Sequence, residues 1–129
     1  VSIESIRIDA IPFTDQYGAG WDLGSGPDVY ADIADASNIV FTVDTYYLDV
    51  SPSGLPLQWS LSPAFQIPNW TTAYFVRVWD YDDFSSNDYM GSTNGFQIND
   101  VIANTGYAST LSLHNNSNTI RVVISLSWQ

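Results

Sequence analysis

Residues 74–91 read YFVRVWDYDDFSSNDYMG, a predicted β-strand that runs into a group of aspartates. The first six residues alternate in the manner of a half-buried strand. The loop that follows has no Lys or Arg and carries four carboxylates, those of Asp80, Asp82, Asp83 and Asp88. Crowded carboxylates repel one another, and burial makes their ionised forms unfavourable. The loop is therefore either a solvated acidic turn or a site for a hard divalent cation such as Ca²⁺, which takes about six to eight oxygen ligands.

The composition is that of one globular domain over residues 1–129. Hydrophobic residues make up 45% of the chain and charged residues 13%, which is the reverse of a disordered segment. The absence of Cys excludes disulfides and thiolate zinc sites. The net charge is −11, with three Arg and no Lys, so nucleic acid is excluded as a partner because no cationic surface would neutralise its phosphates.

Turn residues divide the rest of the chain into short segments with the period of strands. The predicted strands cover residues 5–11, 29–33, 39–46, 57–61 with 65–67, 74–79, 96–98, 109–113 and 120–126. Pro63 indicates a bulge or an edge position, residues 115–118 indicate a hairpin turn, and residues 99–103 indicate one helical turn. No segment keeps a helical period, so we predict an all-β fold, an eight-stranded antiparallel β-sandwich.

Two acidic loops share their spacing. Asp22 and Asp28 are six residues apart, as are Asp82 and Asp88, and Asp80 stands two residues before Asp82. Side chains two apart at the end of a strand point the same way. Each loop begins where a predicted strand ends, so both are expected at one pole of the sandwich. Five carboxylates there would enclose a strongly negative space, and two Ca²⁺ ions would offset most of that charge.

These two loops resemble the first and third calcium loops of C2 domains. Residues 21–30, WDLGSGPDVY, resemble the first, and residues 78–82 and 87–91, VWDYD and NDYMG, resemble the third. Residues 56–59, PLQW, more loosely resemble the segment near the second loop. The strand pattern fits that family over nearly the whole chain, in the phospholipase-like permutation. The resemblance implies two Ca²⁺ ions held by the carboxylates of Asp22, Asp28, Asp80, Asp82 and Asp88 and by the backbone oxygens of Trp21 and Tyr81.

Some positions depart from the family pattern or add to it. Val29 replaces a Pro that is common there, and the predicted strand at 39–46 lacks the Lys residues with which many members bind phosphoinositides. Further candidate metal ligands are Ser85, Asp83 and Asp15, although Asp15 fits a turn residue better. An apolar rim for contact with a membrane or another ligand would consist of Phe84, Trp21, Leu23 and Tyr17. The alternative for Trp21 is that it packs beneath its own loop.

Other chemistry fits less well. An EF-hand would need an oxygen ligand, a Gly and a Glu where this chain has Phe84, Ser85 and Gly91. His114 is the sole histidine and lies in a predicted polar turn, so we expect no enzymatic activity. Three functions remain open. The first is calcium-dependent docking to phospholipid, and the second is a calcium-stabilised carbohydrate- or protein-binding or spacer module of a larger secreted or surface protein. The third, against the expectation of no activity, is an enzyme accessory domain or a small hydrolase in its own right. We expect a monomer in an extracellular, periplasmic or cell-surface setting, where calcium is abundant enough to fill weak sites.

Overall fold

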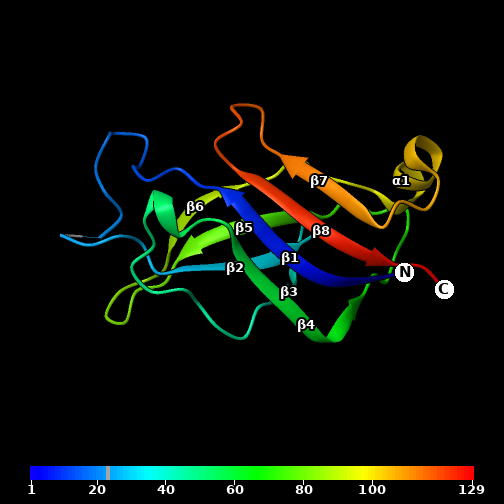
Figure 1. Cartoon of the computed structure of the whole chain (residues 1–129), viewed down its shortest axis with the longest axis horizontal. Helices are drawn as coiled ribbons and strands as arrows, with labels where there is room; N and C mark the ends of the chain where they lie inside the picture. The colour runs from blue at the N-terminus through cyan, green and yellow to red at the C-terminus, as the bar shows by residue number, and fades with distance from the viewer. Residues whose placement is uncertain (23) are drawn as a thin grey trace.

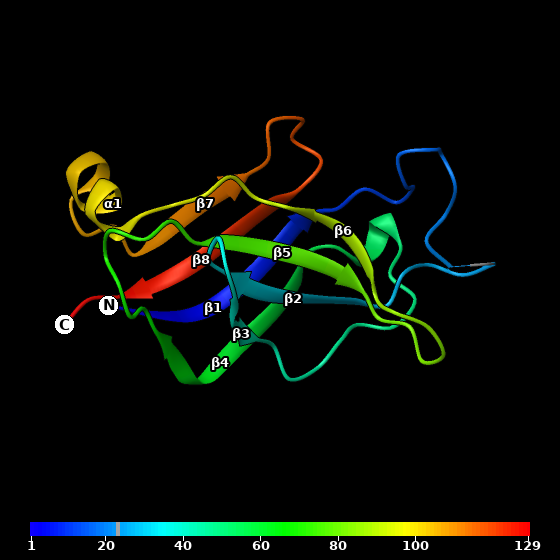
Figure 2. The same cartoon turned by 180° about the vertical axis from the view of Figure 1, so that it is seen from behind.

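The computed structural model describes residues 1–22 and 24–129, which form two four-stranded antiparallel sheets packed face to face (Figures 1 and 2). One sheet has the strand order β4-β1-β8-β7 and consists of β1 (Ser2–Ala10), β4 (Leu57–Gln66), β7 (Thr110–His114) and β8 (Arg121–Ser127). The other has the order β3-β2-β5-β6 and consists of β2 (Val29–Ala34), β3 (Ile39–Thr42), β5 (Phe75–Asp80) and β6 (Asp88–Ser92). The predicted eight-stranded antiparallel β-sandwich is confirmed.

The hydrophobic core lies between the sheets and is built from alternate residues of each strand. Ile6 and Ile8 of β1 and Val122 and Ile124 of β8 are sealed from solvent, and their sequence neighbours on the outer face are partly or fully exposed. The pleat of a strand sends successive side chains to opposite faces, so the period-two patterns in the sequence become the inner face of each sheet.

Strand β5 contributes valine side chains to the hydrophobic core and, at its last residue, a carboxylate to one end of the sandwich. Val76, Val78 and Asp80 face inward and are fully buried, whereas Arg77 and Trp79 face outward and are partly exposed. The inward row therefore passes from two valines to a carboxylate. Asp80 consequently lies at the margin of the hydrophobic core, where a strand would ordinarily place an apolar residue.

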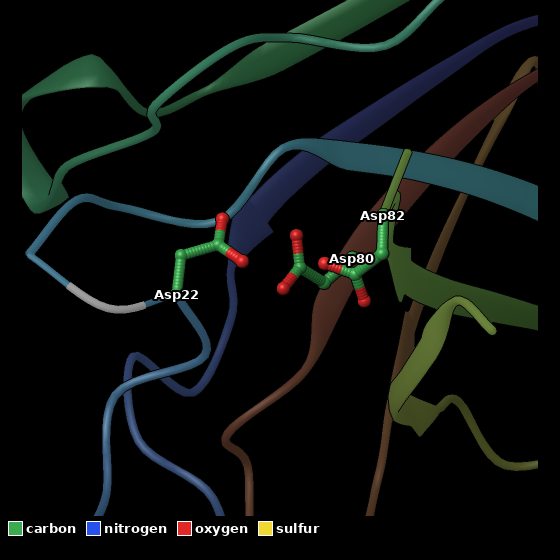
Figure 3. A group of neighbouring side chains, drawn as sticks. All are labelled: Asp22, Asp80 and Asp82. Carbon is green, nitrogen blue, oxygen red and sulfur yellow. The ribbon is translucent and has the colours of Figure 1, made fainter. Parts of the chain in front are cut away.

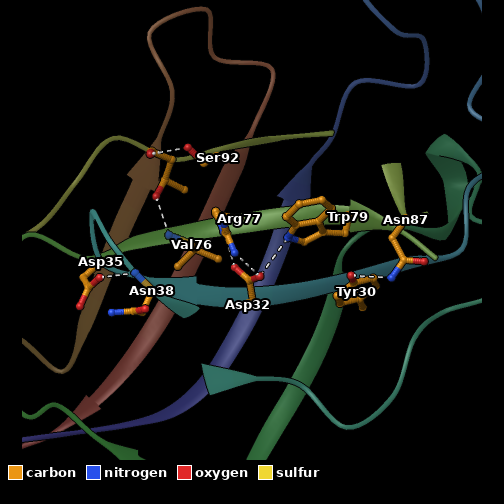
Figure 4. Close-up of polar contacts among 10 residues, drawn as sticks. Tyr30, Asp32, Asp35, Asn38, Val76, Arg77, Trp79, Asn87 and Ser92 are labelled. Atoms are coloured by element: carbon orange, nitrogen blue, oxygen red, sulfur yellow. Dashed lines mark hydrogen bonds and ion pairs between the residues drawn. The ribbon is translucent and has the colours of Figure 1, made fainter. Parts of the chain in front are cut away.

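The outer face of the same sheet carries a polar and aromatic network (Figure 4). Asp32 of β2 accepts two hydrogen bonds of 2.7 Å from Arg77 and one of 3.0 Å from the indole Nε1 of Trp79. Asn87 donates to the Tyr30 hydroxyl at 3.0 Å (Figure 4). These contacts join β2, β5 and the loop before β6 on the solvent side of the sheet.

Three elements differ from the sequence prediction. Residues 96–98 do not form a strand, because Phe96 makes only an isolated bridge and Ile98 begins α1 (Ile98–Thr105), which packs Ile98 and Val101 on the core. Strand β6 takes the eighth place by pairing with β5, although its sequence reads as a loop. β3 ends at Thr42 rather than at residue 46. Pro63 lies within β4 at the edge of its sheet, as predicted.

The two ends of the sandwich carry different features. Both termini and α1 lie at one end, and the loops that follow β1, β3 and β5 lie at the other (Figures 1 and 2). Within residues 1–22 and 24–129, no helix has the length and hydropathy needed to span a membrane. The loop end is where the acidic stretches of the sequence come together.

Candidate metal centre

Three loops meet at the pole opposite the termini (Figure 1). They are residues 11–28 between β1 and β2, residues 43–56 between β3 and β4 with the short 3₁₀ helix η1 (Pro52–Gly54), and residues 81–87 between β5 and β6. Val50 N donates to Pro27 O at 2.9 Å, and Tyr81 N donates to Asp28 O at 2.8 Å. The first loop is therefore bonded to both of the others, and the two acidic loops lie side by side.

The carboxylates of Asp22, Asp80 and Asp82 form a group that we call the acidic cluster (Figure 3). One oxygen from each lies within 4.8 Å of the other two. Asp22 reaches in from the first loop, while Asp80 and Asp82 project from the end of β5 (Figure 3). Oxygens on opposite sides of a Ca²⁺ ion are about 4.6–5.2 Å apart, twice the usual Ca–O distance. The separation in the cluster is therefore compatible with a shared ion.

Asp80 is the most buried member of the cluster, with no exposed surface. Its Oδ1 accepts a hydrogen bond of 2.8 Å from Asp28 N. Its Oδ2 is buried without a hydrogen-bond partner in the described chain, and so is Oδ2 of Asp82. Burial raises the pKa of Asp80 to about 7, and the nearby carboxylates of Asp22 and Asp82 add to the rise, against the lowering effect of the Asp28 N–H.

Asp82 is perturbed in the same direction. Its pKa is raised first by loss of solvation and then by the carboxylates of Asp88 and Asp22. Asp88 stands opposite Asp80 in the β5–β6 ladder, which explains how it comes near Asp82. The cluster is thus an electrostatic unit to which Asp88 also belongs, although Asp88 itself is exposed.

Asp28 lies at the same pole but faces another loop. Its Oδ1 accepts a hydrogen bond of 2.9 Å from the backbone N–H of Asp49. All five carboxylates predicted as ligands are therefore at one end of the molecule. Asp22, Asp80 and Asp82 share a centre, Asp88 adjoins Asp82, and the Asp28 side chain is engaged with residues 43–56.

No basic side chain of the described residues balances the cluster. Arg7 pairs with Asp9, and Arg77 pairs with Asp32 on the outer face of the sheet. Among residues 1–22 and 24–129, no salt bridge reaches Asp22, Asp80 or Asp82. A buried charge needs a compensating partner, and the described residues supply none to this cluster.

The remaining candidate ligands border the cluster or lie away from it. Trp21 precedes Asp22, and Tyr81 lies between Asp80 and Asp82, so the backbones of both adjoin the cluster. The other three candidates do not join the cluster. Asp15 accepts hydrogen bonds from Tyr17 N (2.8 Å) and Ala19 N (3.0 Å), as a turn residue does. The carboxylate of Asp83 raises the pKa of the Tyr81 hydroxyl, and Ser85 is exposed in the bend of the third loop.

The predicted apolar rim divides into exposed and packed members. Phe84 has 102% of the exposure of a free side chain, and Tyr17 has 85%. Trp21 instead packs partly against the core and donates its indole N–H to Pro12 O at 2.8 Å, as the alternative for that residue predicted. Leu23 lies outside the described residues.

Asp49 is a residue at this pole that sequence reasoning missed. Its Oδ1 accepts a hydrogen bond of 2.6 Å from Gly26 N, while its own N–H donates to Asp28. Its backbone has a φ of +53°, the left-handed region in which Asp is among the tolerated residues. A Cβ on Gly26 would collide with Val50 O, so the close approach of these loops requires glycine there. Asp49 shares its loop with Asp44, five residues before it, and so lacks the six-residue spacing that identified the other acids.

The chain matches no protein-family model and no curated protein. What the acidic cluster does is therefore argued from its own geometry and charge.

Proposed function

We propose that this domain binds Ca²⁺ at the acidic cluster of Asp22, Asp80 and Asp82. The observation that carries the proposal is the pair of buried Oδ2 atoms, on Asp80 and Asp82, that have no hydrogen-bond partner in the described chain. An unpaired buried acceptor costs about 1–3 kcal/mol, and more when it is charged. A divalent cation bonded to both oxygens would remove that cost and the mutual repulsion of the three carboxylates.

The donor set favours calcium over other metals. The cluster offers oxygen donors alone, which suits a hard cation rather than zinc or copper. The ligands come from loops at the ends of strands, and Ca²⁺ tolerates irregular coordination better than Mg²⁺ does. Backbone oxygens of Trp21 and Tyr81 are the proposed additional ligands, and Asp28 and Asp88 flank the cluster as candidates for a second ion. Asp-rich loops at one pole of an eight-stranded sandwich also support a relationship to C2 domains.

The role proposed for calcium is structural. An ion shared between residues 11–28 and the end of β5 would join segments that repel one another when it is absent, and it would stabilise the folded state through linkage. Such a domain suits the calcium-rich surroundings outside a cell, as part of a secreted or surface protein.

Calorimetric titration with CaCl₂ tests the proposal. The wild type is expected to bind with measurable heat, and Asp82→Asn is expected to weaken binding at least about tenfold because a charged ligand is lost. Asp100→Asn is the matched control, since it makes the same chemical change on α1 at the opposite end and should leave the titration unchanged. A wild-type protein that releases no heat and whose thermal midpoint is the same in CaCl₂ and EGTA would contradict calcium binding.

Phe84 favours a second candidate function, calcium-dependent docking to phospholipid. Its fully exposed ring stands in the loop that follows Asp80 and Asp82, next to the proposed ion. An apolar side chain so placed can enter the interface of a bilayer while the ion bridges to lipid phosphates. The lack of Lys in the chain makes this docking dependent on the ion.

Sedimentation with phosphatidylserine vesicles tests the docking. The wild type should pellet with vesicles in CaCl₂ and stay in solution in EGTA, and Phe84→Ser should pellet less. Ile39→Ser, which removes another exposed apolar side chain at the start of β3, is the control. Equal pelleting of the wild type and Phe84→Ser, or none in CaCl₂, would leave calcium binding intact and reject the lipid role.

A further inference from the structure

Asn94 and Gly95 form the one Asn-Gly pair of the chain and lie shortly after β6. Both residues are exposed, between the buried residues Thr93 and Phe96. Asparagine is among the thermolabile residues of proteins. A following glycine makes it more so, because the next backbone nitrogen can then approach the side-chain amide without hindrance from a Cβ. Whether this chemistry occurs in the folded chain depends on the hydrogen bonds around the pair.

The backbone nitrogen of Gly95 is open to solvent. Its N–H donates no hydrogen bond to any of the described residues, whereas the backbone on either side is anchored. Thr93 N donates to Val76 O at 2.9 Å, and Phe96 N donates to Tyr74 O at 2.9 Å. In a helix or a paired strand the Gly95 N–H would be occupied and could not pass its proton to solvent. The fold thus leaves the nucleophile of the reaction free.

The Asn94 side chain makes a single exposed contact. Its Nδ2 donates to Oδ1 of Asn116, in the β7–β8 hairpin, at 2.9 Å. Its backbone N–H donates to O of His114, the last residue of β7, at 2.8 Å. Because Thr93 still bonds to β5, the chain passes from one sheet to the other at Asn94. Asn94 therefore ties the two sheets together along the side of the sandwich formed by β6 and β7.

The other eight asparagines are less suited to the reaction. Each is followed by a residue with a side chain, which hinders attack by the next backbone nitrogen. Asn69, Asn87 and Asn115 are also held in place, because Oδ1 of each accepts a hydrogen bond from a backbone N–H. Sequence and structure together single out Asn94.

We propose that Asn94 is a site of spontaneous deamidation in the folded protein. The Gly95 nitrogen gives up its proton and forms a bond to Cγ of Asn94. The bond from Cγ to Nδ2 breaks, and Nδ2 leaves as ammonia with a proton equivalent to the one that Gly95 lost. Water then adds to either carbonyl of the resulting succinimide ring and opens it, which leaves aspartate or isoaspartate. The reaction consumes only water and is independent of calcium.

The two products differ in their effect on the fold. Aspartate leaves the main chain unchanged, and Asn116 can turn its amide so that Nδ2 donates to the new carboxylate. Isoaspartate routes the main chain through the side-chain carbon and lengthens it by one C–C bond, about 1.5 Å. The added atom lies between the anchors at Thr93 N and Phe96 N, which cannot both stay within the hydrogen-bond limit of about 3.2 Å. The isoaspartate form therefore loosens the contact between the sheets.

Peptide mapping by mass spectrometry tests the reaction on the folded protein during incubation in mildly alkaline buffer. Asn94 is expected to become aspartate and isoaspartate before any other asparagine, and enzymatic methylation of isoaspartyl groups measures the second product. Asn94→Gln keeps the amide but would have to close a less favourable six-membered ring, so it should abolish the signal. Asn38→Gln is the matched control, because it changes another exposed asparagine, in the turn between β2 and β3, and should leave the signal at Asn94 unchanged.

Thermal unfolding measures the consequence. The isoaspartate-rich wild type should melt roughly 2–5 °C below the fresh protein, as expected when about one hydrogen bond is lost from a chain of this length. Asn94→Asp reproduces the other product and should melt with the fresh wild type. The proposal is overturned if another asparagine converts first, if Asn94 converts only when the protein is unfolded in urea, or if the isoaspartate-rich and fresh proteins melt together. These results hold whether or not the domain binds calcium, so they are independent of the calcium titration.

Discussion

Replacing Asp80 with Asn should have opposite effects on stability in the absence and in the presence of calcium. Asn has nearly the same shape, and its side-chain oxygen still accepts the hydrogen bond that Asp28 N donates at 2.8 Å. The substitution removes a charge that has no exposed surface and that faces Asp22 and Asp82. Without calcium the substitution should relieve the electrostatic cost of a buried charge, whereas with calcium it should remove a proposed ligand.

The pKa of Asp80 gives the size of the first effect. The pKa rises from the ordinary 3.8 to about 7, because burial and the neighbouring carboxylates disfavour the ionised form. At about 1.4 kcal/mol for each pKa unit, the ionised side chain costs at most about 4 kcal/mol. Water at the loop pole screens part of that repulsion, so we expect about 1–2 kcal/mol. For a chain of this length that corresponds to a rise of roughly 3–10 °C in the thermal midpoint.

Differential scanning calorimetry in EGTA and in CaCl₂ measures both effects. In EGTA, Asp80→Asn should melt above the wild type, and in CaCl₂ it should lose most of the calcium-induced rise that the wild type shows. Asp100→Asn should follow the wild type in both buffers. If Asp80→Asn melts below the wild type in EGTA and still responds fully to calcium, the carboxylate is a structural group and the reasoning is refuted.

The same pKa fixes the sign of the pH dependence. The raised pKa means that the calcium-free folded protein holds the Asp80 proton more tightly than the unfolded chain does. This contribution to stability is complete below the unfolded pKa of about 4 and is lost as the pH rises through about 7. The Asp80 contribution to stability, measured by urea unfolding in EGTA, should therefore fall between about pH 4 and 7 and level off above that. With calcium the trend should reverse, because protons and Ca²⁺ compete for one oxygen set. A flat profile in EGTA would contradict the burial argument.

Other substitutions test the scaffold around the site. Arg77→Met removes the ion-pair partner of the 1%-exposed Asp32 carboxylate and should destabilise the protein by about 3–5 kcal/mol in urea unfolding. Arg7→Met breaks an ion pair whose side chains are 43% and 31% exposed and should cost less than about 1 kcal/mol. Gly26→Ala pushes a Cβ into a backbone carbonyl of the neighbouring loop and should lower both the thermal midpoint and the calcium affinity, whereas Gly20→Ala, where the nearest atom is 3.7 Å away, should change neither.

The sequence was sufficient for the fold where side chains alternate. β5 and β8 show clean period-two patterns, and both form within one or two residues of their predicted bounds. The pattern misled at residues 96–98, where buried Ile98 belongs to a helix whose buried residues are three apart. The alternation of side chains gave no signal for β6, because the segment DYMGS is held extended by its pairing with β5 rather than by its own residue types. Tertiary pairing, not local preference, decides such edge strands.

The candidate site was predictable to the extent that it depends on strand ends. Asp80 and Asp82 are two positions apart at the end of β5 and so point the same way, and the six-residue interval that the two acidic loops share pointed to Asp22 as their neighbour. The direction of the Asp28 side chain was not predictable, because it depends on the backbone N–H of Asp49 in a loop with its own conformation. The left-handed φ at Asp49 and the contact at Gly26 arise only once the loops have packed together.

The strongest argument for an external cation comes from how the chain treats its other buried acid. Asp32 and Asp80 lie on neighbouring strands and are almost equally buried, at 1% and 0% exposure. Asp32 is matched by the guanidinium of Arg77 and the indole of Trp79, so each of its oxygens has a donor. Asp80 receives one backbone N–H, keeps an oxygen without a partner in the described residues, and faces two more carboxylates. Within the described residues, an arginine lies beside Asp32 and none lies beside Asp80, which supports the proposal that the Asp80 charge is neutralised from solution. With a pKa of about 7, Asp80 is neutralised by protons only in part near neutral pH, and the proposed divalent ion, shared by three carboxylates, would neutralise it more fully.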